Sequence, residues 1–190
     1  MDKFVTIIGG GLAGCEAAYQ IAKQGIKVKL YEMKPEKFSE AHKNENLAEI
    51  VCSNSFKSNL HTNACGLLKE ELRLLSSLLI QCADETSVPA GQALAVDRED
   101  FSKLVTQKIK ENPYIEIINK EYTGEELITK KEKNKEEIII IATGPLTSNA
   151  LAENISKITG ENHLYFYDAA APIIKKDSID MNIAFYRKPI

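Results

Sequence analysis

Short apolar runs and helical stripes alternate along the first part of the chain. Phe4–Ile8 is apolar and β-branched and ends at three glycines, which predicts a buried parallel strand. Small apolar residues then recur at helical spacing as far as Gly25, which predicts a helix packed closely on the sheet. Lys27–Glu32 alternates polar and apolar residues and predicts a second strand. The opening of the chain therefore predicts a βαβ unit.

The middle of the chain is less regular. Residues 37–63 are largely polar, and we expect them to form loops. After these loops, one apolar stripe with steps of four and three predicts a single amphipathic helix. The residues of the stripe are Leu68, Leu72, Leu75, Leu79 and Cys82. A further helix is expected to start at Asp97, whose carboxylate can cap free N–H groups, and to end at Asn112-Pro113.

The last patterned region predicts strands and one more helix. Tyr114–Ile118 and Glu126–Thr129 predict two short strands. Ile138–Ile141 is too apolar and β-branched for an exposed strand, so we expect it at the centre of the sheet. A helix over residues 150–158 is expected to begin after Thr147 or Ser148 and to stop at Gly160. Together these elements predict an α/β fold of the Rossmann-like type.

Composition and charge narrow the function. With 24 basic and 27 acidic residues, the formal net charge is −3, which does not suit a strongly basic nucleic-acid binder, so any RNA contact must be local. The four cysteines form no C-x-x-C pair, and no metal site is predicted. The first apolar run is too short for a signal peptide or a membrane span. We therefore expect a cytoplasmic protein with free thiols.

A glycine motif follows the first strand. Residues 9–14 contain G-x-G-x-x-G between a predicted strand and a predicted helix, the context in which this motif binds the diphosphate of a dinucleotide. Glu32 ends the second strand, where a carboxylate can accept hydrogen bonds from an adenosine ribose and repel a 2′-phosphate. The alternative is a tight turn without a ligand. The candidate binding residues here are Gly9, Gly10, Gly11, Leu12, Ala13, Gly14 and Glu32.

FAD and NAD share this fingerprint, so a second signal is needed. About a hundred residues separate Glu32 from the strand at Ile138, which implies a large insertion rather than a short crossover. The strand ends in Ala142-Thr143-Gly144, which resembles the second flavin-site motif of the FAD families related to glutathione reductase. We add Ala142, Thr143 and Gly144 to the candidate cofactor-binding residues and expect the cofactor to be FAD.

Eight sequence blocks together carry a resemblance that spans nearly all of the 190 residues. The blocks are Gly9–Gly14, Leu30–Pro35, Val51–Ser55, Asn63–Glu71, Val88–Gly91, Ala93–Arg98, Ala142–Ser148 and Tyr165–Pro172. In this order, they closely resemble one enzyme family, the folate- and FAD-dependent tRNA (uracil-5-)-methyltransferases.

The resemblance implies an enzyme that takes a methylene group from 5,10-methylenetetrahydrofolate and reduces it with NAD(P)H through FAD. The methyl group is delivered to C5 of a T-loop uridine in tRNA, with no membrane, metal or obligatory protein partner. Three alternatives stay open: a ribosomal RNA uridine as target, the related flavoprotein that modifies the wobble uridine with a partner GTPase, and a non-catalytic FAD-binding fragment. The blocks Tyr165–Pro172 and Val51–Ser55 favour the methyltransferase over the wobble-uridine flavoprotein.

Cys52 is the candidate catalytic residue. Its block, Val51–Ser55, resembles the family segment whose cysteine assists as a proton donor or acceptor, whereas the family's covalent nucleophile lies beyond residue 190. From the residues alone, Cys52 reads more readily as a small loop or core residue. Cys15, Cys65 and Cys82 are expected to be structural.

The resemblance also predicts the domain organisation. We expect the first βαβ of the FAD-binding domain in residues 1–35 and an insertion in 36–136. The chain should return to the sheet in 137–160 and start a second, incomplete domain for substrate or RNA in 161–190. No Gly-Asp dipeptide occurs, although related FAD folds use one near the C-terminus. We therefore expect the N-terminal portion of a longer enzyme, truncated at its C-terminus.

Overall fold

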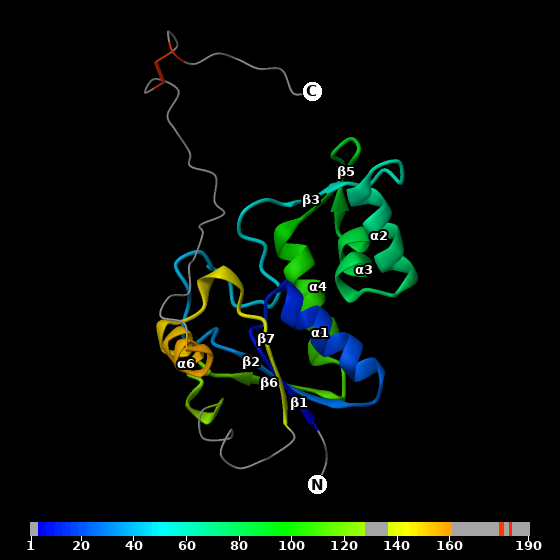
Figure 1. The fold of residues 1–190 in the computed structure, drawn as a ribbon. Helices are drawn as coiled ribbons and strands as arrows, with labels where there is room; N and C mark the ends of the chain where they lie inside the picture. The colour runs from blue at the N-terminus through cyan, green and yellow to red at the C-terminus, as the bar shows by residue number, and fades with distance from the viewer. Residues whose placement is uncertain (1–3, 128–136, 161–178, 181–182, 184–190) are drawn as a thin grey trace.

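A parallel sheet with helices on both faces carries the fold (Figure 1). The computed structural model describes residues 4–127, 137–160, 179–180 and 183. In that part the sheet has four strands in the order β6-β2-β1-β7. The strands are β1 (Phe4–Ile8), β2 (Lys27–Glu32), β6 (Ile115–Asn119) and β7 (Ile138–Ile141). The predicted βαβ unit and the α/β Rossmann-like class are confirmed.

One predicted boundary of each of the helices α1, α4 and α6 has a local cause in the sequence. Helix α1 (Leu12–Lys23) joins β1 to β2, and the chain leaves it through Gly25 at φ +73°. Helix α4 (Arg98–Lys110) begins after Asp97, whose carboxylate accepts hydrogen bonds from the N–H groups of Glu99 and Asp100. Helix α6 (Asn149–Thr159) ends at Gly160, in the left-handed conformation with φ +76°.

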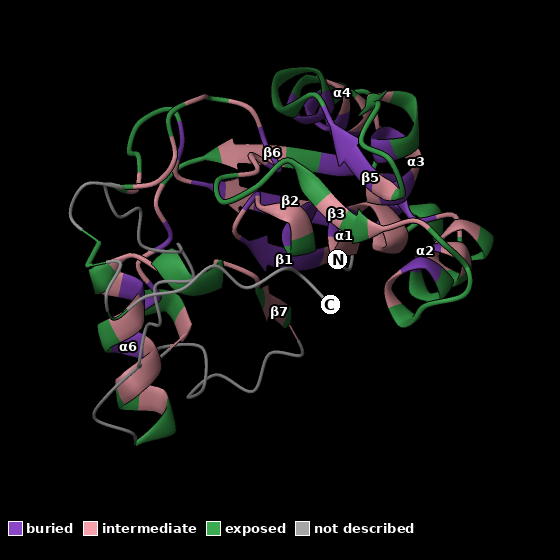
Figure 2. Ribbon diagram, turned by 90° about the horizontal axis from the view of Figure 1, so that it is seen from above, coloured by how far each residue is buried: buried purple, intermediate pink, exposed green. Residues whose placement is uncertain are grey.

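The core lies on both faces of the sheet because successive strand residues point to opposite sides. Ile7 packs with α1 and α4 in the larger cluster, where Phe101 is fully buried. Ile8 packs on the other face with Leu151 of α6. Figure 2 shows the buried residues concentrated in β1, β2 and the helices beside them. Packing on both faces of the sheet therefore fixes the carboxyl ends of its strands, where a ligand would bind.

The single helix expected over the stripe from Leu68 to Cys82 is wrong. The chain forms α2 (Ala64–Leu74) and α3 (Leu78–Glu85), with Ser76 between them at φ +56°. The break is stabilised from outside the segment, because the Glu16 carboxylate of α1 accepts hydrogen bonds from the Ser77 hydroxyl and from the first N–H groups of α3. As a result the Leu75 side chain is 69% exposed rather than packed in one stripe.

A second, antiparallel sheet was not predicted. It has the order β3-β5-β4 in the described residues, with β3 (Ser55–Ser58), β4 (Ser87–Val88) and β5 (Ala93–Val96). Strand β3 lies in the segment that was expected to be irregular, because its four residues are mostly polar and show no apolar alternation. Pairing with the buried β5, about forty residues later in the chain, supplies the order that local sequence does not.

Two strand predictions near the end of the described region need correction. Strand β7 exists, but it lies at one edge of the four described strands rather than at the centre, with Ile138 63% exposed. The apolar run did not predict this position, because among the described strands β7 pairs only with β1. The strand expected over Glu126–Thr129 is also wrong where it is described, since residues 125–127 are helical. The domain expected in 161–190 lies outside the described residues, except for 179–180 and 183.

Candidate functional site

The glycine turn between β1 and α1 is a closely packed backbone structure. A Cβ on Gly14 would lie 1.8 Å from the carbonyl oxygen of Gly9, so the first turn of α1 and the end of β1 approach each other as only glycine allows. Gly9 itself has φ +105°, and a Cβ there would lie 2.6 Å from the carbonyl oxygen of Ala142. The backbone of the glycine motif therefore contacts the backbone of the Ala142–Gly144 motif directly.

Gly11 differs from the other glycines of the motif because nothing fills the space beside it. A Cβ on Gly11 would meet no heavy atom within 4 Å. Gly11 is the N-cap of α1, and no side chain caps the helix there. The first N–H groups of α1 therefore face an open approach, which is what a bound diphosphate requires.

Glu32 is held in place at the end of β2. Its side chain is buried, and its two carboxylate oxygens accept hydrogen bonds from the backbone N–H groups of Gly10, at 2.8 Å, and Lys34, at 3.0 Å. Each carboxylate oxygen retains acceptor capacity, since it can take two hydrogen bonds. This fixed carboxylate can accept hydrogen bonds from the hydroxyl groups of a ribose.

The second motif forms the opposite wall. Ala142 follows β7 and donates its N–H to the carbonyl of Ile8, 2.8 Å away, which continues the parallel pairing of β1 with β7. The hydroxyl oxygens of Thr143 and Thr147 lie 2.6 Å apart, and Thr147 also donates to the carbonyl of Gly144. These contacts fix the turn beside the glycine motif.

Both motifs and Glu32 line one cavity of about 520 Å³. All ten candidate cofactor-binding residues except Gly14 line it directly, and Gly14 packs behind the turn. An open helix N-terminus, a fixed carboxylate at the end of β2 and a cavity of this size fit a dinucleotide. The residues present therefore suit the cofactor that the sequence predicts.

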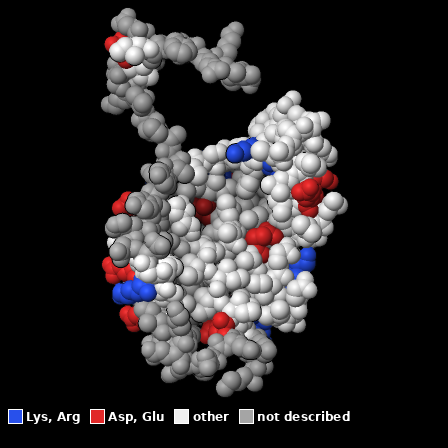
Figure 3. All heavy atoms as spheres, in the orientation of Figure 1, with Lys and Arg blue, Asp and Glu red and all other residues white. Residues whose placement is uncertain are grey.

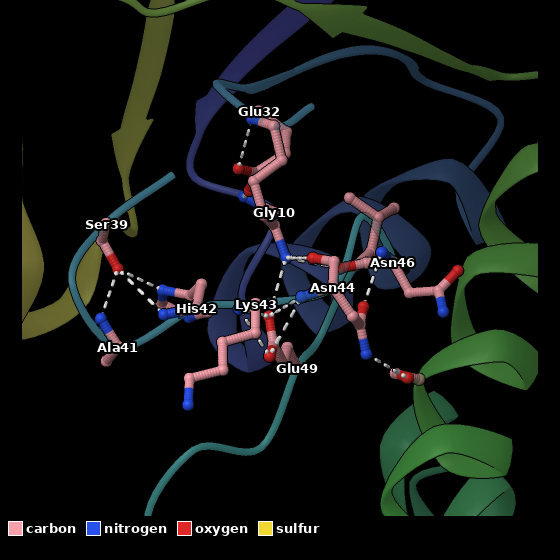
Figure 4. Close-up of polar contacts among 12 residues, drawn as sticks. Gly10, Glu32, Ser39, Ala41, His42, Lys43, Asn44, Asn46 and Glu49 are labelled. Atoms are coloured by element: carbon pink, nitrogen blue, oxygen red, sulfur yellow. Dashed lines mark hydrogen bonds and ion pairs between the residues drawn. The ribbon is translucent and has the colours of Figure 1, made fainter. Parts of the chain in front are cut away.

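Lys34 has a structural role that the sequence analysis missed. Its buried ammonium group donates to the carbonyls of Asn44, at 3.1 Å, and Asn46, at 2.5 Å, and lies 3.4 Å from a carboxylate oxygen of Glu49. The Glu49 carboxylate also accepts from the N–H groups of Lys43 and Asn44, as Figure 4 shows. This network holds the segment 43–49 beside the glycine turn, where the Ala48 N–H donates to the carbonyl of Gly10.

Two more titratable residues line the cavity and were not predicted. His42 lines the cavity, and its Nδ1 lies 2.6 Å from the Ser39 hydroxyl oxygen. Burial, followed by the charge of Lys34, lowers the pKa of its imidazole. Glu121 pairs with Lys37 at 2.8 Å, and hydrogen bonds from Lys37 and Ser148 lower the pKa of that carboxyl group. Neither residue belongs to a periodic pattern, so only its place in the fold reveals it.

Cys52 is exposed, unlike the buried thiols of Cys15 and Cys82, but the structure does not place it in the cavity lining. Its neighbour Val51 does line the cavity. Burial, followed by the charge of Glu32, raises the pKa of the Cys15 thiol to about 12. Burial likewise raises the pKa of the Cys82 thiol to about 11. These two thiols are therefore neutral packing groups at physiological pH.

The described residues contain neither a metal cluster nor a membrane-spanning helix. No group of three or more histidine, cysteine or acidic side chains there is arranged to hold a metal ion. No helix in the described ranges is long and apolar enough to cross a bilayer. On the face drawn in Figure 3, the described Lys and Arg side chains are scattered rather than gathered into one patch.

The parallel βαβ unit, the open glycine turn and Glu32 define a dinucleotide-binding protein of the Rossmann type. The sequence model of the family "Glucose inhibited division protein A" matches residues 4–189. The chain belongs to that family.

Curated relatives give a more specific comparison. The chain is 58% identical over 185 residues to the methylenetetrahydrofolate--tRNA-(uracil-5-)-methyltransferase TrmFO of Acetivibrio thermocellus, covering 97% of this chain and 41% of the relative. It is 57% identical over 187 residues to the protein of the same name from Fusobacterium nucleatum, covering 98% of this chain and 41% of the relative. The chain thus spans about two fifths of the length of these relatives.

The solved structure of Aquifex aeolicus GidA aligns with 62% of this chain and 20% of its own, at 18% sequence identity and a TM-score of 0.49.

Proposed function

We propose that this chain forms the FAD-binding portion of a folate-dependent tRNA (uracil-5-)-methyltransferase. The observation that carries the proposal is the single cavity that joins the glycine turn, Glu32 and the Ala142–Gly144 turn. The relatives that share more than half of its residues bear the name of that enzyme. Cavity and similarity independently support the same cofactor domain.

The site suits a nucleotide that lacks a 2′-phosphate. The Glu32 carboxylate, fixed by two backbone N–H groups, can accept hydrogen bonds from the ribose hydroxyl groups and would repel a 2′-phosphate. Lys34 lines the cavity nearby, but the three contacts of its ammonium group with Asn44, Asn46 and Glu49 match its three N–H donors. It therefore has no donor to offer a 2′-phosphate, and FAD fits this part of the cavity better than NADP.

The residues of the cavity would hold FAD by its nucleotide half and diphosphate. Glu32 would bind the adenosine ribose, and the N–H groups that follow Gly11 would bind the diphosphate. Residues Ala142–Gly144 would close the opposite wall. When bound, FAD supplies two-electron transfer and a carrier for the one-carbon unit.

The finer parts of the reaction rest on the family resemblance. We propose 5,10-methylenetetrahydrofolate as the one-carbon donor, NAD(P)H as the reductant and C5 of a T-loop uridine in tRNA as the acceptor, with a ribosomal RNA uridine as the alternative target. The target base must leave its stack to be modified.

Cys52 is proposed to hold or move a proton at the uracil ring during methyl transfer. Its exposed side chain lies one residue from Val51, which lines the cavity, so a base brought to the cavity rim can reach this segment. The role of nucleophile is not assigned to Cys52, because the resemblance places that cysteine beyond residue 190.

The absorption spectrum of the purified chain, with the flavin identified after denaturation, tests the cofactor. Stoichiometric FAD, or its uptake on reconstitution, is the expected result, and a chain that binds no FAD under either condition contradicts the proposal. Methyl transfer to unmodified tRNA transcript with methylenetetrahydrofolate and NAD(P)H then tests the reaction. A flavin-loaded chain without this activity supports the non-catalytic alternative.

The Cys52 role is tested by the same assay on a full-length version of the enzyme. There, Cys52→Ala is expected to lower methylation while the flavin content stays unchanged. Cys65→Ala, on α2 and outside the cavity lining, is the matched control and should leave both unchanged. Equal turnover of Cys52→Ala and the unaltered full-length enzyme would refute the role.

A further inference from the structure

The segment 39–42 contains a histidine whose ring orientation and proton position are set by the protein. The Ser39 hydroxyl oxygen accepts hydrogen bonds from the backbone N–H groups of Ala41 and His42, both at 3.3 Å (Figure 4). A serine oxygen has two acceptor positions and one proton to donate. With both acceptor positions used, the Ser39 hydroxyl donates its proton to Nδ1 of His42, 2.6 Å away.

This hydrogen bond decides which ring nitrogen of His42 is a donor. When Nδ1 accepts and the ring is neutral, the ring proton is on Nε2. Burial and the positive charge of Lys34 lower the pKa of the imidazole, which keeps the ring neutral near pH 7. Nε2 is therefore an N–H donor, and in the described residues it has no hydrogen-bond acceptor.

The ring lies at the nucleotide end of the cavity. His42 lines the cavity together with Glu32, and the charged groups that act on its ring are Lys34, Glu49 and Glu32. Lys34 has committed its own donors to the loop, so it cannot serve a ligand there. His42 Nε2 is thus a side-chain donor at the end of the cavity where Glu32 provides an acceptor.

We propose that His42 binds the nucleotide half of the dinucleotide by donating a hydrogen bond from Nε2 to an oxygen of its ribose–diphosphate portion. This inference rests on the proposed function, because it assigns a further residue to the same cofactor site. Ser39 acts through His42 as a positioning residue, since it holds the ring and selects its tautomer. Glu32 and His42 then provide an acceptor and a donor to the same part of the ligand.

Two polar substitutions of His42 separate the donor from the general shape of the loop. In His42→Gln the side-chain NH₂ can reach the position of Nε2, so binding should be largely retained. In His42→Asn the shorter amide replaces Nδ1 and keeps only the Ser39 contact, so the dissociation constant should rise about tenfold. Ser39→Ala should give a smaller rise, because the donor remains but is no longer oriented.

Titration calorimetry with FAD, ADP and adenosine gives the test, and thermal unfolding of each variant without ligand shows that the fold is kept. Weaker binding of His42→Asn to both FAD and ADP, with adenosine unaffected, assigns the oxygen to the diphosphate. Weaker binding to all three assigns it to the ribose. A loss confined to FAD would overturn the placement at the nucleotide half.

Failure of this inference is distinguishable from failure of the proposed function. If the unaltered chain binds FAD and ADP while His42→Asn binds them equally well, the His42 assignment is overturned and the cofactor site stands. If His42→Asn and His42→Gln lose affinity equally, the position of the donor is irrelevant and the assignment is again overturned. If the unaltered chain binds neither FAD nor ADP, the proposed function fails and this inference fails with it.

Discussion

Two glycines in one motif should respond to the same methyl group in opposite ways. A Cβ on Gly11 meets nothing within 4 Å, and the residue has φ −74° and ψ −170°, which alanine adopts without strain. Alanine is a poorer N-cap than glycine, but it also loses less conformational freedom on folding, and each effect is worth about 0.5–1 kcal/mol. These effects oppose each other, so Gly11→Ala should change the free energy of unfolding by less than about 0.5 kcal/mol.

The same methyl group at Gly14 has no room. A Cβ there lies 1.8 Å from the Gly9 carbonyl oxygen, so α1 must move away from β1, and an overpacked core of this kind costs about 3 kcal/mol. Gly14→Ala should therefore unfold at a clearly lower urea concentration. Gly11→Ala should retain its stability but weaken FAD binding at least about tenfold, because its methyl group occupies the approach of the diphosphate.

Urea unfolding of the chain without cofactor, followed by FAD titration, measures both effects on the same samples. The reasoning about the open turn is refuted if Gly11→Ala binds FAD as tightly as the unaltered chain. It is equally refuted if Gly11→Ala loses as much stability as Gly14→Ala, because the methyl group would then be clashing with the protein. A useful third variant is Gly25→Ala, at the far end of α1 and outside the cavity lining, which should lose about 1 kcal/mol at its φ of +73° and keep full FAD affinity.

Three further predictions follow from the buried groups. Lys34→Met should lower the free energy of unfolding by about 3 kcal/mol, because the partly buried Glu49 carboxylate and the carbonyls of Asn44 and Asn46 lose their partner. The control Lys43→Met replaces an exposed lysine and should change the free energy of unfolding little. Equal urea midpoints of the two variants would contradict this prediction. Iodoacetamide at pH 8 should label Cys52 well before Cys15 and Cys82, as peptide mass spectrometry would show, and simultaneous labelling would contradict their burial. The pKa of the Cys15 thiol in the folded state, about 12, lies above the ordinary thiol value of 9.0, so its contribution to stability is complete below pH 9 and is lost as the pH rises toward 12. The free energy of unfolding of Cys15→Ala should therefore fall less steeply with alkaline pH than that of the unaltered chain, and an unchanged slope would count against this cause.

The parts of the fold that sequence predicts are those whose cause is local. The βαβ unit follows from an apolar run, a glycine turn and an alternating strand, all within the first 32 residues. The start of α4 follows from Asp97, whose carboxylate caps the N–H groups of Glu99 and Asp100, two and three residues further on. In the same way, the candidate cofactor residues could be found because G-x-G-x-x-G has a meaning that depends only on its two flanking elements.

The parts that sequence misses have distant causes. The break between α2 and α3 depends on Glu16, a carboxylate about sixty residues earlier that caps the first turn of α3. Strand β3 depends on pairing with β5. His42 reads as an ordinary loop histidine until the fold places its ring in the cavity near Glu32 and Lys34. Such residues have no periodic or motif signal of their own.

The two motifs of the site are one structure although about 130 residues separate them. The parallel register pairs Ile8 with Ile141, so the residues that follow each strand, Gly9 and Ala142, necessarily meet at the same edge of the sheet. Their contact is so close that a Cβ on Gly9 would overlap the Ala142 carbonyl. A side chain at Gly9 would therefore displace both walls of the cavity at once. The A-T-G turn is thus informative chiefly because β7 lies beside β1, and this explains why it is a weak signal alone and a strong one with the glycine motif.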